Sequence, residues 1–189
     1  MESASGVPVL MKAPMTQGSA LLATFLLGAW LASPCRADLS EDQAKTSLIY
    51  NLTKFVQWPQ SPADKMLNVC VYREDTIIST LLTLRDKTSK GLGLRIQRVD
   101  TTEESRGCHV LFIGRGEQTN LRLLSRALRG QDTLVVSDIP DSAALGAMVE
   151  IFLDNRRIAF KLNKGTADEA NLKLSSQLLS LAKVVYDSK

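Results

Sequence analysis

The sequence predicts a single compact α/β domain, with a mixed β-sheet flanked by helices, preceded by an export signal. Helical and strand-like apolar patterns alternate from residue 40 onward, which is typical of α/β folds. Two neighbouring strand-like runs within residues 148–162 predict a β-hairpin, so part of the sheet should be antiparallel. Residues 38–189 have the length of one domain, with neither a linker nor an internal repeat to divide them.

The first 37 residues are expected to be a cleaved signal peptide. Ala20–Ala32 is an apolar run of 13 residues, too short to span a bilayer as a helix but of the right size for a signal-peptide core. Two small residues, Cys35 and Ala37, precede the abruptly polar segment that starts at Asp38. We therefore expect export to the periplasm and cleavage after Ala37.

Two details of this leader leave alternatives. Lys12 is the only basic residue before the apolar core, and translation from Met11 would give a leader of conventional length. Cys35 could instead carry a lipid, although Pro34 directly before it argues against that role.

Cleavage would leave two cysteines, Cys70 and Cys108. In an oxidising compartment, one disulfide between them is the simplest interpretation. The competing interpretation, two unpaired core thiols, requires a reducing compartment. A metal site is less well supported, because two cysteines and a single histidine do not make a four-ligand set.

Charge and hydropathy exclude some partners. The formal net charge of the chain is only +3, and loss of Lys12, Arg36 and Glu2 with the leader lowers it by one. A strongly basic surface for nucleic acid is not indicated. No other apolar stretch approaches 18 residues, so nothing else in the chain is expected to cross a membrane.

The first predicted helix, Ser40–Trp58, begins at a capping box formed by Ser40 and Gln43. Its apolar residues recur with helical spacing, and it ends before Pro59 because proline cannot continue a helix. The elements that follow are a strand over Leu67–Tyr72, a helix over Thr76–Leu84 and an alternating strand over Leu92–Val99.

The middle of the chain is predicted to hold a strand over Cys108–Ile113, a helix over Gln118–Leu128 and a short buried strand over Thr133–Val136. Pro140 is at the favoured first position of a further helix, which Gly146 is expected to end.

The C-terminal part begins with the predicted hairpin, Met148–Leu153 and Arg157–Leu162, around a turn at residues 154–156. A second capping box is expected at residues 166–169. It is followed by a long amphipathic helix over Leu172–Tyr186.

The sequence contains no arrangement typical of an enzyme, and we expect no cofactor and no metal. His109, the only histidine, would need a nucleophile or carboxylate beside it. Gly114-Arg115-Gly116 occupies a place where phosphate loops occur, but it lacks the other residues of a nucleotide fingerprint and is more simply a tight turn. Ser137-Asp138 ends a strand where ligands bind in open α/β sheets, or it only leads into the next helix. Ser175-Ser176-Gln177 has no base within reach along the sequence.

Two surfaces are candidates for binding a partner. Arg122, Arg126 and Arg129 share one side of a predicted helix and its end; they form either a solvated face or a docking surface for an acidic partner or anionic headgroups. The predicted C-terminal helix is apolar over more than one stripe, so it is heavily buried or offers one edge, with Leu179 and Tyr186, to a partner or a second copy.

Several motifs in this order resemble the YfiR family over nearly the whole of residues 38–189. They are Lys54-Phe55-Val56-Gln57-Trp58-Pro59, Val110-Leu111-Phe112-Ile113-Gly114, Thr133-Leu134-Val135-Val136-Ser137-Asp138, Gly146-Ala147-Met148-Val149, the segment 155–163 and Leu172-Lys173-Leu174-Ser175-Ser176-Gln177-Leu178-Leu179. The resemblance implies a non-enzymatic periplasmic repressor. Such a protein binds the periplasmic sensor portion of an inner-membrane diguanylate cyclase of the YfiN type, and so controls cyclic di-GMP and biofilm formation.

The resemblance also bears on the cysteines and on the alternative function. Cys70 and Cys108 match the family's structural disulfide, whereas the second cysteine pair that some members carry near residues 143–152 is absent from this sequence. Redox sensing through a second bridge is therefore not expected. The alternative is a periplasmic small-molecule-binding module that feeds a histidine kinase or a transporter, with the strand ends near Gly114 and Ser137 as its site.

Overall fold

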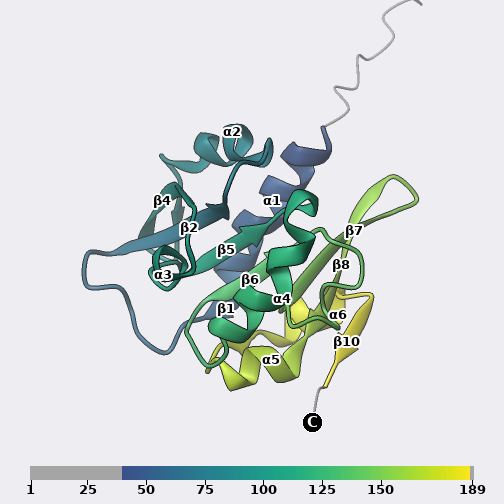
Figure 1. Ribbon diagram of the computed structural model, residues 1–189. Helices are drawn as coiled ribbons and strands as arrows, with labels where there is room; N and C mark the ends of the chain where they lie inside the picture. Colours follow the sequence, from purple (N-terminus) through teal and green to yellow (C-terminus); the bar gives the residue numbers. More distant parts are fainter. Residues whose placement is uncertain (1–39, 188–189) are drawn as a thin grey trace, which may run out of the picture. The chain divides into compact units, whose positions relative to one another are not determined.

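The computed structural model describes residues 40–187, and the expected signal peptide, with Cys35 and the cleavage point, lies outside them. The described part confirms the predicted fold class, a mixed sheet flanked by helices (Figure 1). None of the helices in this part is long and apolar enough to cross a membrane.

The main sheet has eight strands in the order β10-β8-β7-β6-β5-β2-β4-β3. Its parallel centre consists of β4 (Leu92–Val99), β2 (Met66–Tyr72), β5 (Val110–Ile113), β6 (Leu134–Ser137) and β7 (Val149–Asp154). At one side β8 (Arg157–Asn163) pairs antiparallel with β7, and β10 (Val184–Tyr186) is the edge strand, parallel to β8; at the other side β3 (Thr88–Ser89) pairs antiparallel with β4.

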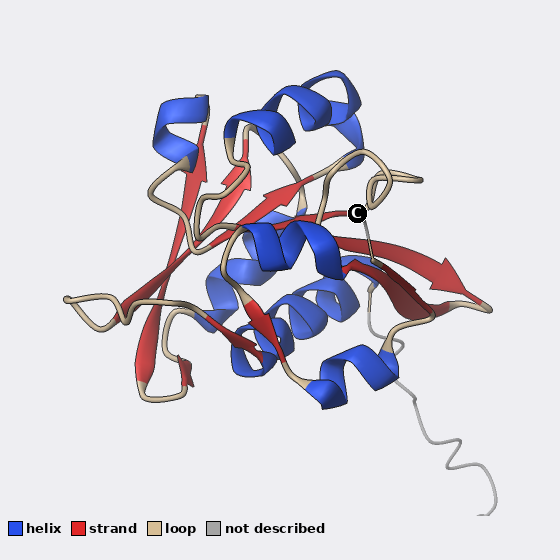
Figure 2. Ribbon diagram, turned by 90° about the horizontal axis from the view of Figure 1, so that it is seen from below, coloured by secondary structure: helices blue, strands red, loops and turns tan. Residues whose placement is uncertain are grey.

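Helices cover both faces of this sheet (Figures 1 and 2). Every residue of β5 and β6 is buried, as expected for parallel strands between two helical layers. Val110 and Phe112 of β5 join one hydrophobic cluster with α1 (Glu41–Phe55) and α2 (Ile77–Leu81), whereas Leu111 and Ile113 join a second cluster with α4 (Gln118–Ala127). Because successive side chains of β5 point to opposite faces of the sheet, this strand contributes to both hydrophobic clusters.

The predicted capping box at the start of α1 is present. The Ser40 hydroxyl accepts from the Gln43 N–H at 3.2 Å, and the Gln43 side chain accepts from the Ser40 N–H at 2.9 Å. The helix ends at Phe55 rather than Trp58, because β1 (Val56–Gln57) pairs antiparallel with β9 (Lys173–Leu174) in a separate two-stranded sheet. Short helical turns complete the connections: η1 (Leu82–Leu84), α3 (Thr102–Ser105) and η2 (Arg115–Glu117).

The predicted hairpin of β7 and β8 is confirmed. Asn155 and Arg156 at its tip both have positive φ, 48° and 62°, as a type I′ turn requires. Asp154 faces Arg157 across the end of the ladder.

The predicted helix after Pro140 is wrong, because residues 140–146 form successive turns. The buried carboxylate of Glu150 accepts the N–H of Ala143 at 3.1 Å, and the Asn163 side chain donates to the Ala143 carbonyl at 2.8 Å. Side chains distant in sequence therefore take both backbone groups that a helix would have used.

The predicted long helix over Leu172–Tyr186 is also wrong. The segment divides into β9, the short helix α6 (Ser176–Leu181) and the edge strand β10. Ser175 caps α6 by accepting the N–H of Leu178 at 3.1 Å, and the β-branched Val184 and Val185 that follow favour a strand. The apolar residues spread over more than one helical stripe because only part of the segment is helical.

The helix before this segment, α5 (Lys164–Glu169), starts earlier than predicted. Asn163, rather than the expected box at residues 166–169, caps it by accepting the N–H of Thr166 at 3.0 Å.

Candidate functional site

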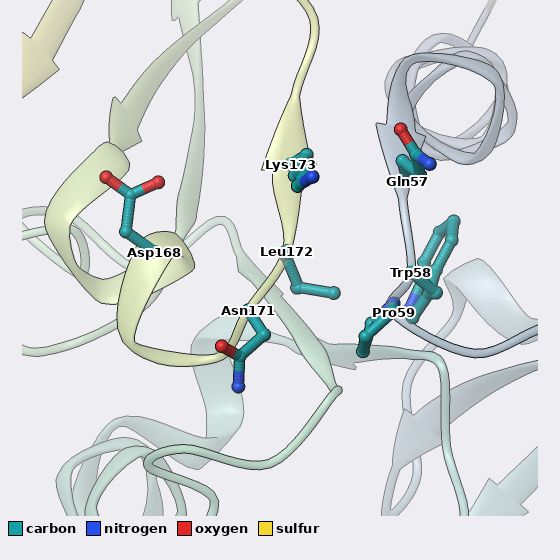
Figure 3. A pocket seen from close by; sticks show the side chains of 7 residues that line it. All are labelled: Gln57, Trp58, Pro59, Asp168, Asn171, Leu172 and Lys173. Carbon is teal, nitrogen blue, oxygen red and sulfur yellow. The ribbon is translucent and has the colours of Figure 1, made fainter.

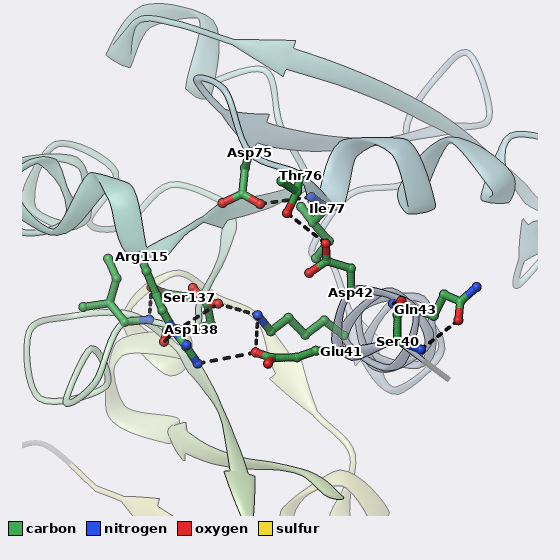
Figure 4. Close-up of polar contacts among 12 residues, drawn as sticks. Ser40, Glu41, Asp42, Gln43, Asp75, Thr76, Ile77, Arg115, Ser137 and Asp138 are labelled. Carbon is green, nitrogen blue, oxygen red and sulfur yellow. Dashed lines mark hydrogen bonds and ion pairs between the residues drawn. The ribbon is translucent and has the colours of Figure 1, made fainter. Parts of the chain in front are cut away.

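A group of charged side chains lies where β5 and β6 end (Figure 4). Arg115 follows β5 and Asp138 follows β6, while Glu41 and Lys45 come from the first turns of α1. The ammonium of Lys45 lies 2.6 Å from the Asp138 carboxylate and 2.7 Å from that of Glu41. Arg115 reaches Glu41 at 3.4 Å and donates to the Asp138 carbonyl at 3.2 Å. These four residues are called the Lys45 cluster below.

The position of the Lys45 cluster in the sheet is the one where ligands bind in open α/β folds. After β2 the chain forms β4 on one side of it, then returns to form β5 on its other side. Ligands bind outside the carboxyl ends of the strands at such a reversal. A cleft of about 380 Å³ is present here, lined by the Lys45 cluster together with Asp42, Asp75 and Thr76.

Burial and pairing set the charges in the Lys45 cluster. Burial of the Lys45 ammonium acts to lower its pKa, but hydrogen bonds with Asp138 and Glu41 outweigh this and raise the pKa of Lys45. The hydrogen bond with Lys45 holds the pKa of Glu41 below its usual value. Asp138 is 6% exposed, and its Oδ1 atom has no hydrogen-bond partner among the described residues.

Asp75 lies beside the Lys45 cluster, and its carboxylate explains why residue 114 is a glycine. Its Oδ1 atom accepts the N–H of Ile77 at 3.0 Å, and a β-carbon at Gly114 would collide with its carboxylate. Burial raises the pKa of Asp75, and the charges of Asp138 and Asp42 act in the same direction. Gly114-Arg115-Gly116 therefore begins a short helical turn. Gly114 has no side chain, which leaves space for the carboxylate of Asp75.

A second cleft, of about 490 Å³, opens where β1 and β9 pair (Figure 3). Trp58 and Pro59 line one side, while Asp168, Asn171 and Leu172 line the other. Trp58 and Pro59 were predicted as the end of a helix and as part of a family motif, but not as the lining of a cleft. This cleft depends on a pairing between segments more than 100 residues apart.

His109 has a structural place in the fold. Its Nδ1 atom accepts the N–H of Asn68 at 3.0 Å, and its carbonyl accepts from Leu134 at 2.8 Å and from the Trp58 indole at 3.3 Å. Burial lowers the pKa of His109, which keeps the ring neutral and able to accept that bond.

Cys70 and Cys108 form the disulfide that the sequence predicts, with their α-carbons 5.9 Å apart. Cys70 lies in β2, and Cys108 precedes the adjacent strand β5. Both residues are buried in the cluster beneath α4. The bridge therefore fixes two neighbouring central strands.

The structure brings the three predicted arginines to one cleft of about 390 Å³, called the arginine cleft. Arg122, Arg126 and Arg129 are exposed on its α4 side, and Arg129 pairs with Glu169 at 3.7 Å. Tyr186 is 37% exposed on β10. It lies in register with Asn163, which also lines the cleft.

The other predicted side chains on the C-terminal segment have different places. Leu179 is only half-buried and packs against the main core. Ser175 caps α6, and Ser176 and Gln177 are exposed in its first turn. Among residues 40–187 there is no group of three or more histidine, cysteine or acidic side chains that could hold a metal ion.

Lys45 and Glu41 were not predicted from the sequence as site residues. One signal was available, because Lys45 falls three and four residues before Leu48 and Ile49, on the apolar stripe of α1. A lysine at such a position is buried when it has an acidic partner. Asp75 carried no comparable signal, since its place depends on the turn after β2.

Comparison with known proteins identifies the family. The model of the YfiR/HmsC-like family matches residues 42–183. The chain belongs to the YfiR/HmsC-like family. This match includes all strands of the sheet except β10 and both cysteines of the disulfide.

Two solved structures share the fold at low identity. One is an ABC domain from Streptococcus pneumoniae in complex with L-Trp, 10% identical, with a TM-score of 0.50 over 76% of this chain and 60% of that one. The other is a conserved domain protein from Vibrio cholerae, 13% identical, with a TM-score of 0.55 over 78% of this chain and 61% of that one. The chain thus spans about three fifths of the length of both, and the likeness concerns the fold alone.

Proposed function

We propose that the protein is an exported regulator that represses an inner-membrane diguanylate cyclase of the YfiN type by direct contact. Its leader is removed after Ala37, and residues 38–189 act in the periplasm without a catalytic step. The match of residues 42–183 to the YfiR/HmsC-like family carries this proposal. The disulfide between Cys70 and Cys108 supports it, because such bonds persist in oxidising compartments.

Several charged and polar side chains of the described core are engaged in holding the fold. Lys45 pairs with Asp138, and Lys161 pairs with Glu150 at 2.8 Å. The unprotonated Nδ1 atom of His109 accepts the backbone N–H of Asn68. These groups are tied to neighbouring elements, which favours regulation by binding over catalysis.

Two exposed surfaces are candidates for the contact with the cyclase. One is the surface formed by Arg122 and Arg126 of α4 and by Arg129 directly after this helix. The other, called the C-terminal surface, consists of the exposed apolar residues of α6 and β10: Leu181, Val184, Val185 and Tyr186, next to the half-buried Leu179. Exposed apolar groups of this kind mark interaction sites in many proteins, and the same surface could pair two copies of the chain.

Deleting the gene tests the repressor. Cellular cyclic di-GMP and attachment should rise, and the effect should vanish when the cyclase gene is deleted as well. Export is tested in the strain that still carries the gene, by N-terminal sequencing of the periplasmic protein, which should begin at Asp38. Cyclic di-GMP at the wild-type level in every growth condition would contradict repression, and a lipidated Cys35 would contradict cleavage after Ala37.

A second candidate function is the binding of a small molecule that feeds another membrane sensor. The cleft at the Lys45 cluster favours it, because it lies at the strand ends where the winding of the sheet reverses and holds an unpartnered carboxylate oxygen of Asp138. A thermal-shift screen of periplasmic metabolites should then find a stabilising ligand. The cleft is lined by more carboxylates than cations, so Asp75→Asn, which removes one negative charge, should weaken the binding of a cationic ligand.

A further inference from the structure

The arginine cleft has two charged side chains without partners. Arg122 and Arg126 are one helical turn apart on α4, and neither side chain has a hydrogen bond or ion pair with another described residue. Arg129 at the rim is only 3.7 Å from Glu169. The cleft therefore has three guanidinium groups against one carboxylate, an excess of two positive charges.

The floor of the arginine cleft contains a buried hydroxyl without a partner. Ser125 is only 8% exposed, and its Oγ atom forms no hydrogen bond with any described residue. Leaving a buried hydroxyl unpaired costs free energy, and most such groups have a partner in the functional state. Ser125 lines the same cleft as Arg122 and Arg126, so a ligand there could supply the missing bond.

Gly146 packs directly against Ser125 in the same cleft. Gly146 lines the cleft with a φ of 106°, a conformation that other residues rarely adopt. A β-carbon at this position would come within 2.9 Å of the Ser125 side chain. Only glycine therefore fits beside Ser125, because a larger residue at this position would press on the Ser125 side chain.

We propose that the arginine cleft binds a phosphate group. Guanidinium groups match phosphate oxygens with paired hydrogen bonds, and a phosphate offers enough acceptors for Arg122, Arg126 and the Ser125 hydroxyl together. A phosphate monoester, as a dianion, balances the two excess positive charges, and the phosphodiester of a phospholipid headgroup balances one of them. The site recognises the phosphate itself, whether it belongs to a small phosphate ester or to a phospholipid headgroup. This proposal does not rest on repression of a cyclase.

The test is calorimetry on the purified exported protein. Inorganic phosphate and glycerol 3-phosphate should bind, acetate should bind more weakly, and added salt should weaken all three. Arg122→Gln and Arg126→Gln should each lower phosphate affinity about tenfold or more, because each removes charged hydrogen bonds. Arg156→Gln is the matched control, because Arg156 is an exposed arginine at the hairpin tip, away from the cleft residues.

Ser125→Ala distinguishes ligand binding from a purely structural role. It removes an unpaired buried hydroxyl, so the free protein should keep or gain thermal stability while phosphate affinity falls several-fold. If Ser125 served the fold alone, the variant would lose stability and keep its phosphate affinity.

Vesicles separate the two sources of phosphate. Co-sedimentation with phosphatidylglycerol vesicles, but not with phosphatidylcholine vesicles, that is lost in Arg122→Gln identifies a lipid headgroup. Binding of glycerol 3-phosphate without co-sedimentation identifies a free ester. Absence of binding in both arms, or binding that both arginine variants retain, would overturn the proposal.

Discussion

The ammonium of Lys45 lies 2.6 Å from the carboxylate of Asp138, and both side chains are more than nine-tenths buried. Their positions are 93 residues apart in the sequence. The pair joins the first helix to the end of the central strand β6. The ion pair therefore connects the helical layer of α1 to the carboxyl ends of the parallel strands.

Removal of one partner from this pair should be costly. Lys45→Met leaves the buried charge of Asp138 with only Arg115 at 3.5 Å, and breaking a buried pair in this way costs about 3–5 kcal/mol. Urea unfolding measures the loss. Lys54→Met is the control on the same helix, because Lys54 is exposed and only stacks on Tyr50, which is worth about 1 kcal/mol or less. Equal losses of unfolding free energy in Lys45→Met and Lys54→Met would contradict a stabilising buried pair of Lys45 and Asp138.

His109 should make the protein less stable in mild acid. Its pKa is lowered from 6.5 by burial, so the unfolded chain binds the proton more readily than the folded protein. Stability is then fully present above pH 6.5 and decreases as the pH falls below that value. The carboxylates with lowered pKa values, Glu41, Asp64 and Glu104, titrate in a more acidic range.

The measurement is the urea midpoint at pH 7.5, 6.5 and about 5.5. His109→Asn keeps an oxygen that can accept from the Asn68 N–H but cannot titrate, so its midpoint should change less over this range than that of the natural protein. Parallel curves for the two proteins would show that another group causes the acid sensitivity.

The disulfide should stabilise the protein mainly by restricting the conformations of the unfolded chain. It closes a loop between positions 38 residues apart, and removing a bridge of this kind costs about 2–5 kcal/mol. The double variant Cys70→Ala/Cys108→Ala is preferred to serine, because both sites are buried and a serine there would bury an unpaired hydroxyl. A reductant should lower the midpoint of the natural protein and leave that of the double variant unchanged.

The sequence was sufficient for elements whose pattern is local. The Ser40 and Gln43 capping box, the alternating strand β4 and the hairpin with two positive φ angles all formed as predicted. The two helices that were wrongly predicted, after Pro140 and over Leu172–Tyr186, have a common cause. Turns at residues 140–146 depend on Glu150 and Asn163, and β10 depends on pairing with β8; in both places a distant partner decides the conformation of an apolar segment.

The same distinction holds for the candidate sites. The three arginines and the two cysteines were identified because spacing or number singled them out. The strand ends that carry Arg115 and Asp138 were also considered as a ligand site. Lys45, Glu41 and the cleft beside Trp58 were not, since each depends on contacts between segments far apart in sequence. Ser125 carried no signal at all, because its significance lies in a missing hydrogen bond.

Two leucines of α6 allow the fold and the partner contact to be tested separately. Leu178 is 2% exposed, whereas Leu181, in the same short helix, is 60% exposed. Leu178→Asp buries an unpaired charge in the core and should cost more than about 4 kcal/mol, so the protein should disappear from the periplasm. Leu181→Asp should change the free energy of unfolding by only about 0.5 kcal/mol.

If the C-terminal surface contacts the cyclase, Leu181→Asp should nevertheless raise cellular cyclic di-GMP. The reason is that a charge at the centre of an apolar contact must be desolvated on binding, which weakens the complex without unfolding either protein. Co-purification from membranes should then recover less cyclase with Leu181→Asp than with the natural protein at equal periplasmic abundance. Equal recovery at equal abundance would exclude this surface and leave the arginine face as the contact, because Leu181 is the most exposed residue of the C-terminal surface.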